Sequence, residues 1–232
     1  MCIQEHQLHE YEKAQLEDLF PDYSCDARAY DEVLLLDPSH KPSSGRGGVA
    51  TFWKKIFDPY ITQLPKEGNV RILVIIIAIP GNTPICLINC YLPSGNTPCA
   101  IELYLEDIDV LHELLCKYKY THLTILTGDL NEDHHNRNHV KERKMKELIK
   151  EHCLHEACLD FSHEKTYINP NLGHASHIDH VLVASADTGS LKPATLMPED
   201  DIRLACNLST HRPLSVTLTL NENPLITTNL LL

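Results

Sequence analysis

The sequence of 232 residues lacks any apolar run long enough to cross a membrane as a helix. Its longest such run, ILVIIIAIP at 72–80, has the length of a buried strand. The start of the chain shows no basic segment followed by an apolar stretch, so no secretory signal is visible. We therefore expect an intracellular protein, nuclear or cytoplasmic, that is not secreted and has no membrane partner.

The sequence also lacks cysteine pairs and an excess of positive charge. The nine cysteines are odd in number and include no C-x-x-C pair, which argues against a disulfide framework and favours a reducing compartment. With 20 Lys and Arg against 32 Asp and Glu, the formal net charge is -12, whereas proteins that bind nucleic acid through charge alone are usually basic. A phosphate substrate would have to be met locally, with metal ions offsetting the acidic side chains. Alternatively, the charge only maintains solubility.

Helix-like and strand-like segments alternate along the chain. Helical periodicity covers 7–20, 99–119 and 140–152, and the strand-like segments are 48–55, 70–80, 84–93, 122–129, 177–185 and 212–220. The turn PGNTP between 70–80 and 84–93 indicates a hairpin, and the composition of 39–48 indicates a loop. The sequence shows no internal repeat or long linker. We predict one α/β domain over residues 1–222 with covering helices, and a C-terminal tail over 223–232.

Polar residues collect at the ends of the predicted strands, where loops at one edge of a layered α/β fold would bring them together. They are Glu5, Tyr91, Asp129, Asn131, Asp179 and His211. Carboxylates with an amide and no thiolate favour a hard cation, Mg²⁺ or Mn²⁺. A histidine beside an aspartate can be oriented and held protonated to meet a phosphate.

Within this set, Asp129 could activate water, and Asn131 could position it. Each residue alone also has an ordinary structural interpretation. An aspartate after a strand and a glycine, for example, is often a turn residue or a helix cap. The histidines of DHHNRNH at 133–139 could bind zinc, but this segment lacks a spaced partner motif. Only the joint pattern favours a catalytic function.

Six motifs, in order, resemble those of the endonuclease/exonuclease/phosphatase family, which includes pancreatic deoxyribonuclease and the apurinic/apyrimidinic endonucleases. They are IQEHQL, GRGGVATFW, CYLPSGN, LTGDLNED, HIDHVLVAS and STHRPLSV. The resemblance implies a four-layer sandwich of two mixed β-sheets flanked by helices. It also implies Mg²⁺-dependent hydrolysis of a phosphodiester by in-line attack of water.

The resemblance also implies roles for the site residues. Glu5, Asp129 and Asn131 would hold the metal, and Asp129 and Asn131 would activate or position the water. Tyr91 would contact the phosphate or assist the reaction through its phenol. His211 would stabilise the phosphoryl oxygens, with Asp179 orienting it. Further substrate contacts are expected from Asn131 and from three residues at neighbouring motif positions: Ser94, His177 and Thr210.

The segments SSGRGGVATFW and STHRPL are most similar to the endonuclease domains of non-LTR retrotransposons. This similarity implies a DNA endonuclease that acts on the phosphodiester backbone. Two alternatives stay open: a catalytically degenerate remnant of the fold, and a phosphodiesterase acting on RNA or on small or lipid phosphates. The oligomeric state and the target sequence are not predicted.

Two departures from the family pattern bear on activity. The last motif normally reads Ser-Asp-His, but Thr210 here replaces the aspartate and offers no charge; Asp201 is a candidate to substitute for it. In the family, a strand with a catalytic asparagine and a helix precede the motif that contains Glu5, which is only the fifth residue here. We therefore expect an N-terminally truncated domain without that strand and helix, which would leave an unpaired strand edge.

Overall fold

The structure is a computed structural model that describes residues 1–31, 47–132, 140–157, 165–168, 173–184, 191–196, 210–218 and 228–231. The predicted loop at 39–48 lies outside these residues except for its last two glycines. The histidine-rich segment at 133–139 and Asp201 also lie outside them.

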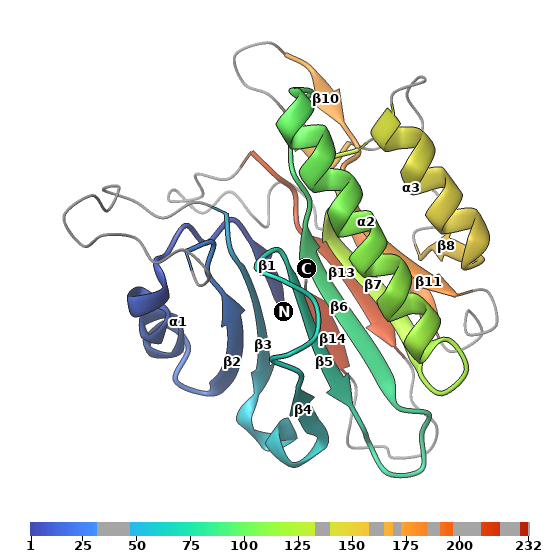
Figure 1. The fold of residues 1–232 in the computed structure, drawn as a ribbon. Helices are drawn as coiled ribbons and strands as arrows, with labels where there is room; N and C mark the ends of the chain where they lie inside the picture. The colour runs from blue at the N-terminus through green and yellow to red at the C-terminus, as the bar shows by residue number, and fades with distance from the viewer. Residues whose placement is uncertain are drawn as a thin grey trace.

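A six-stranded mixed sheet forms the centre of the molecule (Figure 1). Its order is β4 (Ile61–Gln63), β5 (Ile72–Ile77), β6 (Ile85–Tyr91), β7 (Leu123–Asp129), β11 (Asp179–Ala184) and β8 (Leu154–Glu156). The strands β5 and β6 form the predicted antiparallel hairpin. The strands β6 and β7 run parallel, so a crossover must join them, and α2 (Pro98–Tyr118) is that crossover.

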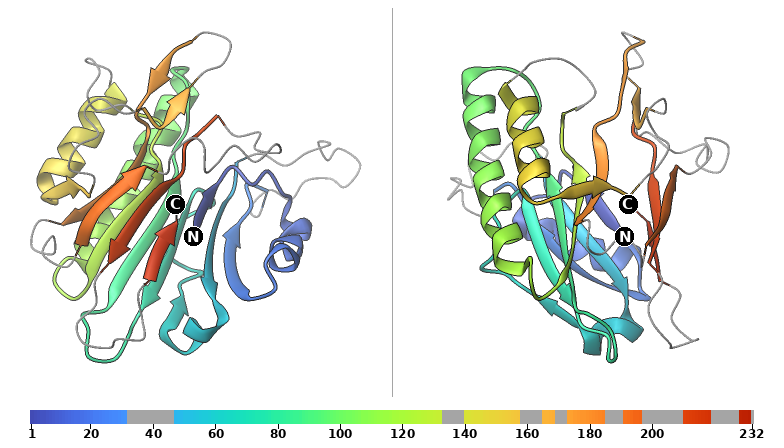
Figure 2. Two further views of the ribbon diagram at one scale, coloured as in Figure 1. Left: turned by 180° about the vertical axis from the view of Figure 1, so that it is seen from behind. Right: turned by 90° about the vertical axis from the view of Figure 1, so that its right-hand side faces the viewer.

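Two three-stranded antiparallel sheets face the six-stranded sheet (Figure 2). One has the order β1 (Cys2–Gln4), β3 (Val49–Lys54) and β2 (Tyr23–Arg28). The other has the order β12 (Leu191–Leu196), β13 (Leu214–Leu218) and β14 (Thr228–Leu231), so part of the segment expected to be a tail pairs with β13. A small hairpin of β9 (Tyr167–Ile168) and β10 (Ala175–Ser176) completes the described strands.

Helices lie on the outer face of the six-stranded sheet and of the sheet of β1, β3 and β2, which confirms the prediction of mixed sheets flanked by helices (Figures 1 and 2). The helices α2 and α3 (Val140–Glu151) lie on the outer face of the six-stranded sheet. The short α1 (Ala14–Leu19) packs through Leu16 against Ala50 and Phe52 of β3. A 3-10 turn, η1 (Glu10–Glu12), precedes α1, and another, η3 (Lys55–Tyr60), follows β3.

The apolar runs of the central strands are continuous because both faces of the six-stranded sheet are buried. Alternate residues point to opposite faces: Val74 and Ile88 join the core beneath α2, whereas Leu73 and Leu87 join the core between the sheets.

The predicted helix over 7–20 is too long by about one turn. Only η1 and α1 are helical, because His9 has an extended backbone and caps η1, its N–H donating to Oε2 of Glu12 at 2.9 Å. Gln7 has a left-handed φ of +55°, which no right-handed helix accommodates.

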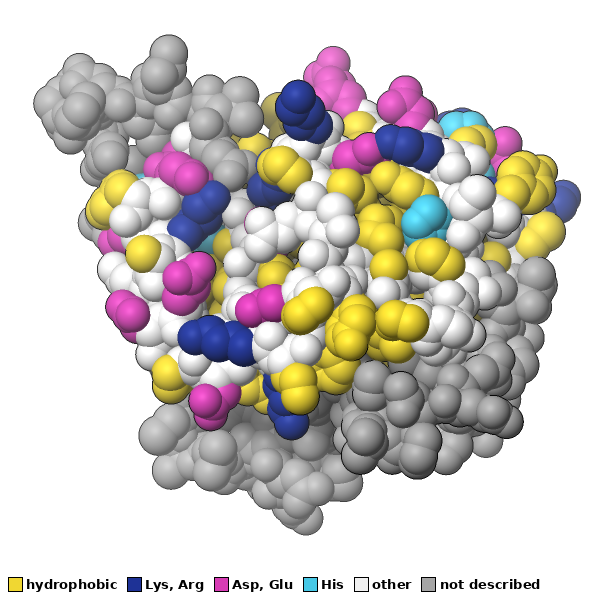
Figure 3. Space-filling model, turned by 90° about the horizontal axis from the view of Figure 1, so that it is seen from below, with side chains coloured by type: hydrophobic (Ala, Val, Ile, Leu, Met, Phe, Trp, Pro, Cys, Tyr) yellow, Lys and Arg dark blue, Asp and Glu magenta, His cyan; other side chains and the backbone are white. Residues whose placement is uncertain are grey.

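Figure 3 shows the end of the molecule at which α2 finishes. Its described surface carries acidic, basic, histidine and hydrophobic side chains in a mixed pattern. The most exposed large hydrophobic residues of the described chain are Tyr120 and Ile56, at 88% and 75% exposure. Scattered apolar side chains of this kind are normal for a protein surface. Among the described helices, none has both the length and the apolar character that a membrane span requires.

Gly128, one residue before the end of β7, is expected to tolerate no side chain. Its φ is +134°, and an added Cβ would lie 1.9 Å from the backbone oxygen of Cys90 on β6. We expect Gly128→Ala to cost at least about 3 kcal/mol of unfolding free energy, because two paired strands would have to separate. Urea denaturation measures this loss.

Gly81→Ala is the matched control for this variant. Gly81 also has a positive φ, +81°, but nothing lies within 4 Å of its added Cβ. Gly81→Ala should lower the unfolding free energy by only about 1 kcal/mol, which is the cost of a positive φ for an alanine. Equal losses in the two variants would contradict the close approach of β6 and β7 at Gly128.

Candidate active site

The strand register aligns three of the predicted site residues in one row across the central sheet. Asp129 is the parallel partner of Tyr91 on β6 and the antiparallel partner of Asp179 on β11. The backbone continues this alignment beyond the strands, because the N–H of Leu92 donates to the carbonyl oxygen of Asp129 at 2.9 Å. The row therefore rests on rigid, hydrogen-bonded backbone.

A cleft of about 520 Å³ opens over this row. Strands β1, β7 and β11 and the start of β13 line it, with Glu5, Asp129, Asp179, Thr210 and His211 among its side chains. Ligand atoms of Asp129, Asp179 and His211 all lie within 4.8 Å of one another. The sequence placed these residues far apart, and the fold brings them together.

Glu5 reaches the same cleft from the opposite layer. Its backbone has the left-handed conformation, with φ +56°, which costs a residue with a Cβ about 1–2 kcal/mol. The hydroxyl of Tyr91 donates to Oε1 of Glu5 across the two sheets. Burial, followed by this hydrogen bond and the charge of Glu5, raises the pKa of Tyr91. The phenol therefore keeps its proton at neutral pH.

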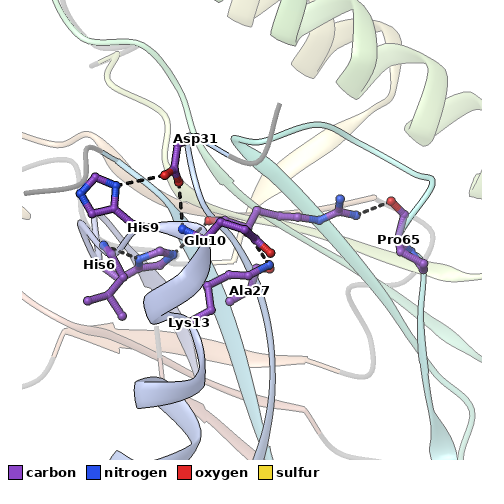
Figure 4. A network of polar contacts seen from close by, with 9 residues as sticks. His6, His9, Glu10, Lys13, Ala27, Asp31 and Pro65 are labelled. Atoms are coloured by element: carbon purple, nitrogen blue, oxygen red, sulfur yellow. Dashed lines mark hydrogen bonds and ion pairs between the residues drawn. The ribbon is translucent and has the colours of Figure 1, made fainter. Parts of the chain in front are cut away.

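A network of polar contacts fixes the chain just after Glu5 (Figure 4). His6 donates from Nε2 to the carbonyl oxygen of Arg28 at 3.0 Å. His9 and the backbone N–H of Glu10 both reach the carboxylate of Asp31, at 3.0 and 2.9 Å. The chain that follows the strained backbone at Glu5 is thus held in place, and surrounding contacts of this kind are how strain persists at functional sites.

A buried amide ties β1 to the central sheet. Asn89 of β6 is fully buried, and its Oδ1 accepts from Nε2 of Gln4 at 2.7 Å. Its Nδ2 donates to the carbonyl oxygen of Ala50 on β3 at 2.9 Å. Because Gln4 precedes Glu5, this bridge sets the position of Glu5 above the row.

Asp179 and His211 form a dyad. Nδ1 of His211 donates to both carboxylate oxygens of Asp179, at 2.9 and 3.0 Å. Burial alone would lower the pKa of His211, but the hydrogen bond and charge of Asp179 outweigh burial and raise it. With Nδ1 engaged by Asp179, any contact of His211 with a substrate would be made by Nε2. The dyad can therefore present a protonated imidazole to an anion.

Thr166, which the sequence did not single out, positions this dyad. Its buried hydroxyl accepts from the backbone N–H of both Ile178 and Asp179, at 3.1 Å each. Its carbonyl oxygen accepts from the N–H of Arg212 at 2.7 Å. One residue thus holds the backbone beside both members of the dyad.

Asn131 is held beside Asp129 by short local contacts. Its backbone N–H donates to Oδ1 of Asp129 at 2.9 Å, and its Nδ2 donates to the carbonyl oxygen of Leu92 at 2.8 Å. Its φ is +50°, a conformation that asparagine tolerates better than most residues. With Nδ2 engaged, Oδ1 is the side-chain atom suited to contact a water molecule or a cation.

Asp129 is 4% exposed and carries the most perturbed carboxyl group of the cleft. Burial, followed by the charge of Asp179, raises its pKa from 3.8 to about 7, and Glu5 adds to the increase. His211 and the N–H of Asn131 oppose the shift. The negative charges of Asp179 and Glu5 therefore act on Asp129 more strongly than His211 offsets. Because a bound cation would relieve this repulsion, the residues fit a divalent metal.

The three other predicted contact residues differ in position. Thr210 is exposed and lines the cleft, and Ser94 is exposed and hydrogen-bonds Tyr91. His177 lies apart from them: it is 2% exposed and packs edge-on against His180, with ring centroids 4.5 Å apart. A side chain so buried would first have to turn outward to contact nucleic acid, and this contact stays a prediction.

Tyr91→Phe is expected to weaken the site without unfolding the protein. The variant removes the hydroxyl that holds Glu5, and one such hydrogen bond to a charged group is worth about 1.5–3 kcal/mol. We expect the affinity of the cleft for a divalent cation to fall about tenfold or more, which a metal titration followed by calorimetry measures.

Tyr120→Phe is the matched control for Tyr91→Phe. Tyr120 is 88% exposed just beyond α2, so its variant should behave as the natural protein does. An unchanged metal titration in Tyr91→Phe would contradict the proposed role of this hydroxyl.

Comparisons with known structures agree with this geometry. The chain is similar to a variant of the 3′ phosphatase NExo from Neisseria bound to a product DNA hairpin, at 18% identity and a TM-score of 0.64, covering 94% of this chain and 87% of that chain. The AP endonuclease LMAP from Leishmania major matches at 16% identity and a TM-score of 0.73, covering 94% and 77%. The endonuclease domain of TRAS1, a telomere-specific non-LTR retrotransposon, matches at 16% identity and a TM-score of 0.60. The match covers 88% of this chain and 81% of that chain.

These likenesses establish the fold. No curated protein matches the sequence. Residues 1–211 match the sequence pattern of the Endonuclease/Exonuclease/phosphatase family. That match includes Glu5, Tyr91, Asp129, Asp179 and His211, which the structure gathers in and beside one cleft. The chain therefore belongs to the endonuclease/exonuclease/phosphatase family.

Proposed function

We propose that the protein is a metal-dependent phosphodiester hydrolase that acts on DNA as an endonuclease, and that it derives from a non-LTR retrotransposon. The observation that supports this proposal most strongly is the cluster of Asp129, Asp179 and His211. Their potential ligand atoms lie within 4.8 Å of one another in the cleft. The cluster combines a buried carboxylate with a histidine held by a second carboxylate. This combination suits water activation and phosphate binding within one reaction.

The metal would be held by Asp129 and Glu5, with Oδ1 of Asn131 beside them. Carboxylate and amide oxygens without a thiolate favour Mg²⁺, with Mn²⁺ as a substitute. When bound, such an ion polarises a phosphate oxygen and offsets charge in the transition state. It would also supply the local positive charge that a protein of net charge -12 otherwise lacks near a phosphate.

The side chains have separate roles in this proposal. Asp129, which titrates near neutral pH, accepts a proton from the attacking water, and Asn131 orients that water. His211 donates from Nε2 to a phosphoryl oxygen while Asp179 holds the ring. Tyr91 keeps its proton and holds Glu5.

DNA is the proposed substrate because the structural relatives named above are DNA-processing proteins, one of them with a DNA hairpin bound. The motifs SSGRGGVATFW and STHRPL support the retrotransposon origin. Thr210 favours one alternative, a degenerate remnant, since it lines the cleft where the family motif has an aspartate.

Nicking of supercoiled plasmid by the purified chain tests this function. We expect nicking with Mg²⁺ or Mn²⁺, none with EDTA, and none from Asp129→Ala. A folded protein that cuts no DNA, even after Thr210→Asp restores the motif carboxylate, would refute the proposal and leave the degenerate remnant. A panel of DNA, RNA and small phosphodiesters separates the endonuclease from a phosphodiesterase of another substrate class.

A further inference from the structure

A second cluster of potential metal ligands lies between the two long helices, away from the cleft. His112 and Cys116 are on α2, and His152 directly follows α3. One ligand atom from each lies within 4.8 Å of the others. Because α2 starts soon after Tyr91 and runs back along the sheet, its second half is remote from the cleft (Figure 1). The nucleic-acid chemistry proposed above uses none of these residues.

The positions on α2 suit a chelating pair. Residues four apart on a helix lie on the same face, one turn from each other. Sγ of Cys116 is accordingly 3.6 Å from Nε2 of His112. Both side chains reach the surface: Cys116 is exposed, and the side chain of His112 is 40% exposed. An ion from solution could therefore reach them.

His152 supplies the rigid member of the cluster. It is 5% exposed, and its Nε2 lies 3.1 Å from Nδ1 of His112, with the two rings packed edge-on. Among the described residues its Nδ1 has no hydrogen-bond partner. The ring therefore presents Nε2 to the cluster.

The separations are close to those of a tetrahedral zinc site. Zinc bonds of about 2.0–2.1 Å to nitrogen and 2.3 Å to sulfur place two nitrogens about 3.3 Å apart and a nitrogen and a sulfur about 3.6 Å apart. The observed distances are 3.1 Å from Nδ1 of His112 to Nε2 of His152 and 3.6 Å from Nε2 of His112 to Sγ of Cys116, so they start from different nitrogens of the His112 ring. Rotation of the partly exposed His112 ring would direct one nitrogen at both partners. Glu151, with Oε2 3.7 Å from Nδ1 of His112, can supply a fourth ligand.

We propose that His112, Cys116 and His152 bind a zinc ion that fastens the end of α3 to α2. A thiolate with two imidazoles selects zinc over magnesium, whereas the oxygen-rich cluster around Asp129 has the opposite preference. The protein would then carry two metal sites of different chemistry. The second is structural, because three or four protein ligands fill it and the cleft residues lie elsewhere.

Titration with Co²⁺, which replaces Zn²⁺ and gives a thiolate-to-metal absorption band, tests the site directly. The full chain is titrated in a phosphine reductant, in an Asp129→Asn background that weakens the cleft cluster. We expect the band to saturate at one equivalent and to disappear when Zn²⁺, but not Mg²⁺, is added. Cys116→Ser should abolish the band, and His112→Asn should weaken Co²⁺ binding about 100-fold or more.

Cys99→Ser is the matched control, since Cys99 is also exposed and stands on α2 near its other end. It should leave the band unchanged. A band that survives Cys116→Ser, or the absence of any band from the folded protein, would overturn the proposal. Thermal unfolding provides a second measurement: a few micromolar Zn²⁺ should raise the Tm of the natural protein and of Cys99→Ser, but not that of Cys116→Ser.

Discussion

Asp129→Asn is expected to abolish metal-dependent hydrolysis while making the metal-free protein more stable. The activity is lost because the amide neither accepts a proton from water nor supplies a charged ligand; we expect a loss of at least about 10³-fold. The stability is gained because the carboxylate is 4% exposed and lies beside Asp179 and Glu5. An amide of the same shape keeps the hydrogen bond from the N–H of Asn131 without burying a charge.

The gain in stability from Asp129→Asn is expected to increase with pH. The pKa of Asp129 is about 7 in the folded protein and 3.8 ordinarily. Between these values, the folded protein holds a proton that the unfolded chain has released. The unfolding free energy therefore falls as pH rises from about 4 to about 7, by an amount on the order of 4 kcal/mol, and no further above that range. Asp129→Asn removes this contribution.

Thermal unfolding in EDTA at pH 5 and pH 8 measures both effects. We expect Asp129→Asn to melt roughly 5 °C or more above the natural protein at pH 8, and above it by a smaller margin at pH 5. Millimolar Mg²⁺ should raise the Tm of the natural protein and narrow the gap, since a cation binds a carboxylate more tightly than a neutral amide. A variant that melts lower than the natural protein at pH 8 would contradict the charge repulsion described here.

The parts of the fold that the sequence predicted are those determined by local pattern. The hairpin of β5 and β6 and the strand β7 are apolar runs bounded by turn residues, and α2 has sustained helical periodicity. Their lengths agree with prediction to within a few residues. By contrast, β2 was missed because YSCDAR is half polar; it is a strand because it pairs with β3 along its whole length.

The same distinction holds in the site. The cluster of Asp129, Asp179 and His211 was predictable, because each residue stands at a strand end within a family motif. The residues that support the cluster were not. Thr166 and Asn89 act through partners distant in sequence, and nothing local distinguishes them from ordinary polar residues. The burial of His177 was equally invisible, since it results from packing against His180.

His211 and Asp179 are expected to act as one unit, so that losing both costs little more than losing one. His211→Gln removes the Nε2 donor proposed to meet the phosphoryl oxygen, and we expect a loss of about 10²- to 10⁴-fold in kcat. Asp179→Asn leaves the imidazole in place but removes the carboxylate that orients it and raises its pKa. The protonated imidazole is then lost at a lower pH, so the alkaline limb of the pH–rate profile should move to lower pH.

The double variant, Asp179→Asn with His211→Gln, distinguishes this role for Asp179 from direct metal binding. The position of Asp179 near Asp129 also allows it to bind the metal. If Asp179 acts through His211, the double variant should be within a fewfold of His211→Gln, because residues that act as a unit are not additive. If Asp179 holds the metal, the two losses should multiply, and Asp179→Asn alone should raise the metal requirement. His155→Gln, a histidine change on the exposed part of β8, controls for effects on folding. An additive double variant would assign Asp179 to the metal and leave His211 to meet the phosphate without its partner.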